Sequence, residues 1–193
     1  MAVISIKNKT KSGSLLVGNA FYNPPIFESI ATTTLGSSAS SVTFSSIPAT
    51  YTHLQLRWIA RSDRAAAQDF VDIRLNSDTG ANYAAHLLYG DGSTATSTAY
   101  VSNTSVGVIF MPGSTATASV FGVGVMDILD YTNTNKYTTT RILGGADING
   151  TGRTVLGSGL WMNTAAVSTL TIITDNASTF SQYSSFALYG IKG

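Results

Sequence analysis

Two histidines, His53 and His86, are the only imidazoles in this 193-residue chain and the first candidates for acid–base chemistry. Each lies in a stretch of alternating apolar and polar residues, which is the pattern of a strand with one buried face. His53 shares the polar side of its stretch with Gln55 and Arg57. We therefore interpret both histidines as solvated strand residues. A Ser–His–Asp triad is defined by geometry and stays open, but a chain this rich in serine contains many accidental trios.

Two pairs of aspartates are close enough in sequence to suggest paired carboxylate chemistry: Asp69 with Asp72, and Asp127 with Asp130. Residues three apart on a strand face opposite sides of the sheet, so the first pair is predicted to diverge. The second pair has the same spacing and runs into a turn. Cleavage of a glycosidic bond needs carboxyl groups about 5–10 Å apart. No catalytic residue is predicted, and we do not expect an enzyme.

The stretch from Asp147 to Gly152, DINGTG, resembles the front of a calcium-binding loop. Its twelfth position is Ser158, where such a loop needs a bidentate glutamate. A turn capped by side chains is the preferred interpretation. The chain has no cysteine, which excludes disulfides and cysteine-ligated metals. Neither a cofactor nor a metal is expected.

Three tyrosines, Tyr100, Tyr131 and Tyr183, are candidates for exposed rings that stack on a sugar. The alternative is that these rings only cover the edges of strands. A surface glycan therefore stays open as a ligand.

These side chains depend on strands for their positions, and the clearest signal runs from Ser41 to Arg61. There Leu54, Leu56, Trp58 and Ala60 alternate with polar residues, while Ile59 is the exception. About ten short strands with turn signals between them are predicted, and Ala65 to Gln68 is at most one helical turn. The stretch after Gly92 reads as a Ser/Thr loop, and Gly144 to Gly159 as a glycine-rich loop. The fold class is an all-β, antiparallel β-sandwich, jelly-roll-like, over residues 28–193.

The composition limits the classes of partner. Charged residues make up 11% of the chain against about 25% in a typical globular protein, and the net charge is +1. Such a chain has no strong positive electrostatic field that would attract nucleic acid or an anionic membrane. The longest apolar run, Val120 to Met126, is too short to cross a bilayer. We expect a protein made in the cytoplasm, without an export signal, that binds neither nucleic acid nor membrane.

Residues 1–27 differ from the rest and are predicted to be an extended anchoring arm. Pro24 and Pro25 form a polyproline-like joint at its end. The arm has no acidic residue and is too apolar to stay solvated. It either wraps its own domain as an extra strand or crosses to a neighbouring molecule, and the joint favours the neighbour. The predicted partner-binding residues are Lys7, Lys9, Lys11, Leu15, Leu16 and Phe21.

Several stretches are similar to those of a known family. KSGSLLVGNAFYNPPIFESIATTTLG, SSVTFSSIPATYTHLQLRWIARSD, LYGDGS, DILDYTNTNKYTTTR, SGLWMNTAAVSTLTI and SSFALYGIKG together cover most of the chain, including the arm. They resemble structural proteins of tailed-bacteriophage virions: minor structural, capsid-decoration (cement) and tail-fibre-like proteins. The resemblance implies a β-sandwich or jelly-roll body and a place in the virion. It brings no catalytic residues with it.

The leading hypothesis is a capsid decoration or cement protein on the outer surface of the virion. Its partners would be the major capsid protein or other virion proteins, held by the arm. Further copies of the chain are also expected as partners, in a homo-oligomer such as a trimer. The alternative is a tail-fibre or receptor-binding virion protein with a carbohydrate ligand.

Overall fold

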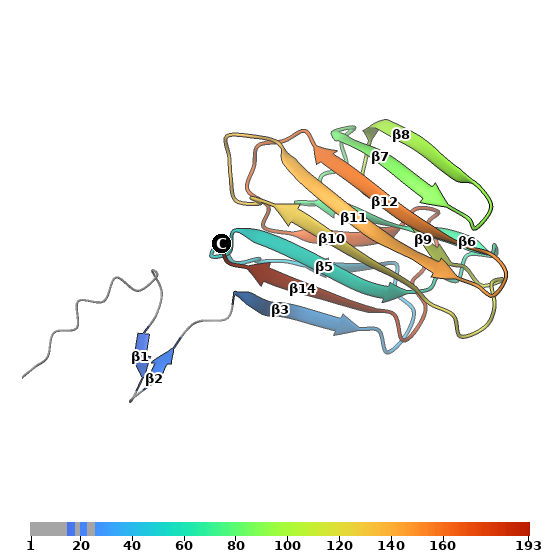
Figure 1. Cartoon of the computed structure of the whole chain (residues 1–193), viewed down its shortest axis with the longest axis horizontal. Helices are drawn as coiled ribbons and strands as arrows, with labels where there is room; N and C mark the ends of the chain where they lie inside the picture. Colours follow the sequence, from blue (N-terminus) through green and yellow to red (C-terminus); the bar gives the residue numbers. More distant parts are fainter. Residues whose placement is uncertain (1–14, 18–19, 23–25) are drawn as a thin grey trace, which may run out of the picture.

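The structure is a computed structural model that describes residues 15–17, 20–22 and 26–193, with side chains from residue 26 onward (Figure 1). Strands β1 (Leu15–Val17) and β2 (Ala20–Tyr22) pair with each other, antiparallel, in a two-stranded sheet of their own. The lysines predicted as partner-binding residues, Lys7, Lys9 and Lys11, lie outside the described residues.

Twelve further strands of the described chain form two antiparallel sheets, and no helix occurs among them. The larger sheet has the order β3 (Phe27–Thr34), β14 (Ser185–Ile191), β5 (His53–Ala60), β10 (Gly122–Leu129), β11 (Thr138–Asp147), β12 (Gly152–Trp161), β7 (Tyr83–Gly90) and β8 (Ala95–Asn103). The smaller sheet has the order β4 (Ser41–Phe44), β13 (Leu170–Thr174), β6 (Gln68–Leu75) and β9 (Val106–Pro112). The predicted all-β sandwich is confirmed.

The order of the strands is that of a jelly roll. Strands pair in a nested way, β3 with β14, β4 with β13, β5 with β10 and β6 with β9. Successive pairs fall in alternate sheets, as happens when one long antiparallel ribbon is wrapped into a double-layered barrel. Two hairpins, β7–β8 and β11–β12, are inserted into this plan and extend the larger sheet beyond β10.

Strand β5 shows why these residues form this sandwich. Its alternation places Leu54, Leu56, Trp58 and Ala60 in the core, each at most 4% exposed. His53, Gln55 and Arg57 point to the other face, as predicted. The facing core comes from β6, β9 and β13, whose buried apolar residues include Leu75, Ile109, Phe110, Leu170 and Ile172. Burial of this apolar surface is the main stabilising term.

Three predictions of local structure were wrong. The supposed Ser/Thr loop contains strand β8, and the supposed glycine-rich loop contains the end of β11 and most of β12. Ala65 to Ala67 form bends rather than a helical turn, and Gln68 already belongs to β6. Phe27, predicted to be part of the arm, is the first residue of β3, and its ring stacks on that of Tyr189 with centroids 4.8 Å apart.

Two glycines of β10, Gly122 and Gly124, lie very close to other parts of the chain. At Gly122 the backbone of β9 is indeed close, because an added Cβ would lie 3.0 Å from the Met111 Cα. At Gly124 the close neighbour is a side chain. An added Cβ would lie 2.1 Å from Cζ2 of the Trp58 indole. The glycine therefore makes room for the largest side chain of β5.

Substitution of Gly124 tests this packing. G124A should lower the free energy of unfolding by about 1–3 kcal/mol, because the methyl group forces the buried indole to shift. Urea denaturation followed by tryptophan fluorescence measures the change. G36A is the matched control, since an added Cβ at Gly36 meets no atom within 4 Å. If G124A were as stable as G36A, the proposed contact between Gly124 and Trp58 would be wrong.

Candidate functional site

The outer face of the larger sheet carries a row of apolar side chains. Cross-strand register places Val125, Leu143, Leu156 and Leu88 side by side on β10, β11, β12 and β7. The side chain of Leu88 is 52% exposed, and those of Leu143 and Leu156 are each 50% exposed. We call these four residues the apolar row. Exposed apolar side chains that adjoin one another mark contact surfaces more often than single ones do.

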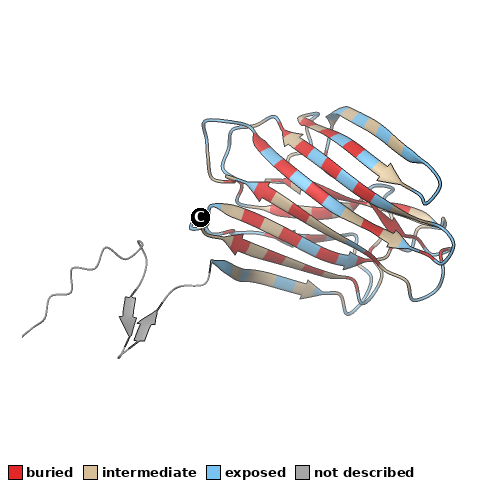
Figure 2. Ribbon diagram, viewed as in Figure 1, coloured by how far each residue is buried: buried red, intermediate tan, exposed pale blue. Residues whose placement is uncertain are grey.

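No described element covers the apolar row, because the smaller sheet packs on the opposite face. Figure 2 shows buried and exposed bands alternating along β5, β11 and β12, as expected when one face of a sheet is dry and the other open. The next row along the strands is polar. There Asp127 accepts hydrogen bonds from Gln55 and from Arg141, whose Nη2 lies 2.6 Å from the carboxylate.

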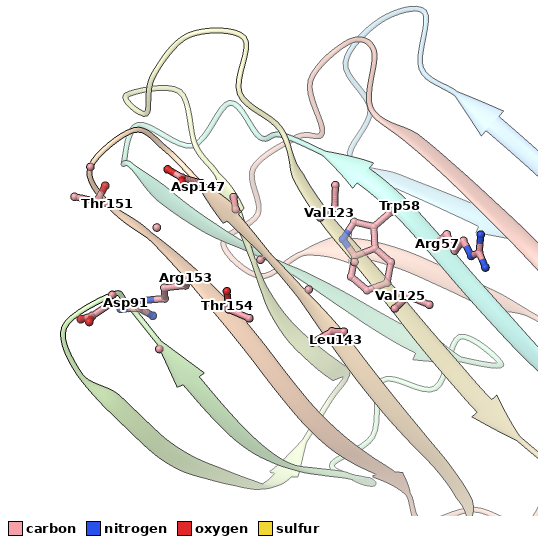
Figure 3. A pocket seen from close by; sticks show the side chains of 18 residues that line it. Arg57, Trp58, Asp91, Val123, Val125, Leu143, Asp147, Thr151, Arg153 and Thr154 are labelled. Atoms are coloured by element: carbon pink, nitrogen blue, oxygen red, sulfur yellow. The ribbon is translucent and has the colours of Figure 1, made fainter.

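A hollow of about 870 Å³ adjoins the apolar row at one end of the sheet (Figure 3). Val123, Val125 and Leu143 line one part of it, and the turns of β7–β8 and β11–β12 line the other. Its size is that of a small-molecule pocket.

Glycines produce much of this hollow. Gly145 has φ 150°, and an added Cβ would lie 2.0 Å from the Arg153 carbonyl oxygen. Gly152 has φ 154°, and its Cβ would lie 2.3 Å from the Ala146 carbonyl oxygen. Only glycine fits these two positions of the β11–β12 hairpin, where Gly145 lies opposite Thr154 and Gly152 opposite Asp147. The backbone is therefore bare where other strands carry side chains.

The charged residues at the rim of the hollow are each held by local contacts. The Asp91 carboxylate accepts hydrogen bonds from the N–H groups of Ser93 and Thr94 and from the Ser93 hydroxyl, which lower its pKa to about 2. The Asp147 carboxylate caps the Asn149 N–H, which agrees with the predicted capped turn. The Arg153 guanidinium lies 4.8 Å from the Tyr89 ring centroid. This arrangement can bind a ligand, but it presents no acid–base pair directed at a common point.

A second candidate lies in the smaller sheet, where Asp72 is 5% exposed. Its carboxylate accepts hydrogen bonds from the Ser105 hydroxyl and from the Val108 N–H, both at 2.8 Å. Burial, with a smaller contribution from the charge of Asp175, raises the pKa of Asp72 to about 6, while both hydrogen bonds and Arg74 oppose the rise. A carboxyl group so perturbed beside a cleft of about 560 Å³ is a site candidate.

The backbone facing Asp72 is strained. Val108 has φ 60°, a conformation that β-branched residues rarely adopt, and the register of β6 and β9 shifts at this point. The Val108 N–H donates a hydrogen bond to the Asp72 carboxylate, which thereby stabilises the bulge. No sequence pattern indicates that Ser105 is buried or that β9 contains a bulge. The hydrogen bonds from Ser105 and Val108 to Asp72 could therefore not be predicted.

The two histidines lie on strands that are not neighbours in the sheet, so they do not form a shared site. His53 is in β5, where its Nδ1 accepts a hydrogen bond from the Asp130 N–H. His86 is exposed in β7 and lines a separate shallow depression with Leu88 and Leu156. Three strands, β10, β11 and β12, lie between β5 and β7 in the larger sheet. Both histidines are strand residues, as predicted, but His53 also has a partner that the sequence did not indicate.

The predicted aspartate pairs and tyrosines do not form common sites. Asp69 faces the core side of β6 and accepts a hydrogen bond from the Ser178 hydroxyl, while Asp72 lies on the other face. Tyr131 was a candidate for an exposed ring, but it is buried and its hydroxyl donates to the Pro48 carbonyl. The prediction that Tyr131 contributes to a sugar-stacking surface is therefore wrong. Tyr183 is 68% exposed.

The remaining predicted binding residues belong to the small sheet near the N-terminus. Leu15 and Leu16 lie in β1 and Phe21 in β2, with Leu15 opposite Tyr22 and Leu16 opposite Phe21. Their side chains fall outside the described part of the structure.

Comparison with models of known protein families gives no match, and a search of curated proteins also finds none. Among the residues described, no three His, Asp or Glu side chains gather in a way that could hold a metal ion. The described part of the chain also has no helix long and apolar enough to span a membrane.

The pKa of Asp72 leads to a prediction about stability and pH. Because its folded pKa is above the unfolded value of 3.8, ionised Asp72 destabilises the fold above pH 6 and this cost disappears as the pH falls. Between pH 7.5 and 4.5, wild type should gain about 2 kcal/mol relative to D72N, which keeps the shape without the charge. Urea denaturation at both pH values measures this difference.

D91N is the control for that experiment. The pKa of Asp91 is lowered, so its contribution to stability is lost only as the pH falls below 3.8 toward about 2. The difference between D91N and wild type should therefore change little between pH 7.5 and 4.5. A D72N difference that was equally flat would show that Asp72 titrates normally in the folded protein.

Proposed function

We propose that this chain is a structural virion protein of a tailed bacteriophage, a capsid decoration protein that binds the shell through residues 1–25 and stabilises it. The observation that carries the proposal is the separate pairing of β1 with β2, which adds a strand to neither sheet of the body. A segment with this apolar composition gains stability by burying its side chains. Because β1 and β2 add no strand to either sheet of the body, we propose that this segment binds another molecule.

The body supports the same role. In addition to the arm, the exposed apolar row of the jelly roll offers a second contact surface for a neighbour in the shell. Many weak contacts of this kind add up in a symmetric assembly, because each copy is held at more than one point. The resemblance to virion proteins in the sequence supports this proposal independently.

The hollow beside the apolar row favours the second candidate, a receptor-binding tail protein. Its bare glycine backbone and its polar rim suit the hydroxyl groups of a sugar. In that case a glycan array should show binding by the purified chain that is lost on T154W, which would fill the hollow. The number of copies per virion separates the two roles, since a decoration protein is present in hundreds and a fibre in few.

Removal of residues 1–25 tests the leading proposal. The deletion keeps Phe27, whose ring stacks on Tyr189 and contacts Arg57, so the body stays intact. Binding of the truncated protein to capsids that lack the protein should fall to background in a co-sedimentation assay, because the anchor is gone. The triple variant K7A/K9A/K11A should bind more weakly at low salt than the matched K7R/K9R/K11R. Capsid binding by the truncated protein equal to that of the full chain would overturn the proposal.

A further inference from the structure

Strand β8 is an edge strand with neither a charge nor a proline, and its one irregularity lies near its end at Asn103. It ends the order of the larger sheet, and no described strand pairs with its outer side. From Gly92 to Met126 the sequence has no charged residue, and β8 itself contains no proline. Natural edges are normally blunted by charges, prolines, bulges or short length, because a bare edge pairs with other strands.

The other three edges of the sandwich do carry such features. Strand β3 has a register shift against β14 and holds Glu28, which pairs with Lys192 at 2.8 Å. Strand β4 has four residues. Strand β9 contains the bulge at Val108 and ends at Pro112. The register shift of β8 lies at its far end, near Asn103, and leaves residues 95–99 regular. The difference singles out β8 (Figure 1).

We propose that β8 pairs with β8 of a second copy, antiparallel across a two-fold axis, and joins the two larger sheets into one. The inference does not depend on the proposed virion role. A second copy fits because β8 has no charge, so no like charges meet when the strand faces itself. The strand is also rich in threonine and contains Tyr100 and Val101, residue types that favour sheets.

The hydrogen bonds of the β7–β8 hairpin give the register. The Asp91 N–H donates to the Thr94 carbonyl, so residues 91 and 94 form a bonded pair. Bonded pairs alternate along an antiparallel ladder. The backbone groups of Thr96 and Thr98 are therefore directed to β7, and those of Ala95, Ser97 and Ala99 point outward.

One symmetric register satisfies these outward groups. With the axis at Thr98, Ser97 of each copy exchanges two hydrogen bonds with Ala99 of the other, and Ala95 faces Val101. Thr98 then faces Thr98 in a non-bonded pair with Cα atoms about 4.5 Å apart. Thr96 faces Tyr100, a favourable pairing of a β-branched residue with an aromatic one.

Sedimentation velocity over a range of concentrations tests the dimer. The full chain should self-associate, and S97P should lower the association constant about tenfold or more, because both copies lose an outward N–H. The ladder to β7 does not use that N–H, so S97P should keep its fold. S97A keeps the N–H and should associate like wild type. A full chain that stays monomeric at high concentration, or an S97P variant that associates normally, would overturn the proposal.

Cross-linking tests the register without relying on S97P. The chain has no cysteine, so T98C alone should form a covalent dimer on mild oxidation, since the facing Cα atoms lie within disulfide range. T96C should not, because its symmetry mate is about 13 Å away along the strand. Equal cross-linking of both variants would show that the register is wrong. Loss of self-association on removal of residues 1–25 would show instead that an exchanged arm joins the copies.

Discussion

The position of the C-terminal strand β14 between β3 and β5 is the constraint on which the rest of the structure depends. β14 pairs with β3 through residues 185–191 and with β5 through the same residues. Its Phe186 and Leu188 are buried, and the Phe186 ring contacts Phe180 edge to face. The ends of the body are thus joined in one ladder, and β3 has no other partner among the described strands. Such distant pairing makes formation of this sheet depend on nearly the whole chain.

The two inserted hairpins give the molecule its asymmetry. The jelly-roll pairs account for four strands in each sheet, while β11, β12, β7 and β8 extend the larger sheet alone. Strand β9 supports this extension from below, where Ile109 meets Gly144 and Val106 meets Gly159. Most of the apolar row and of the lining of the hollow lies on the outer side of this extension, while β10 adds Val125 to the row and β5 and β10 line one side of the hollow. The surfaces available for contacts therefore lie where the insertions meet the basic fold.

The sequence allowed the fold class and the face of β5 to be predicted, because Leu54 to Ala60 alternate with polar neighbours. It failed at β12 because glycines occupy inward positions there. A Cβ at Gly159 would lie 2.1 Å from Val106 Cγ2, so a core position carries no apolar side chain and looks like a loop. It failed at β8 because an edge strand has small polar residues on both faces. The buried contact of Asp72 was overlooked because its partner, Ser105, is far away in sequence. Tyr131 was wrongly expected to be exposed because its partner, Pro48, is also distant in sequence.

The distribution of charge separates the two halves of the larger sheet. Ion pairs gather around β3, β5, β10 and β11, where Glu28 meets Lys192, Asp127 meets Arg141 and Asp130 meets Lys136. These polar rows keep that half hydrated. Strands β12, β7 and β8 take part in no such ion pair among the described residues, and they carry Leu156 and Leu88 of the apolar row together with the uncharged edge. Since solubility of a chain with 11% charged residues depends on where the charges lie, this separation leaves one half suited to water and the other to association.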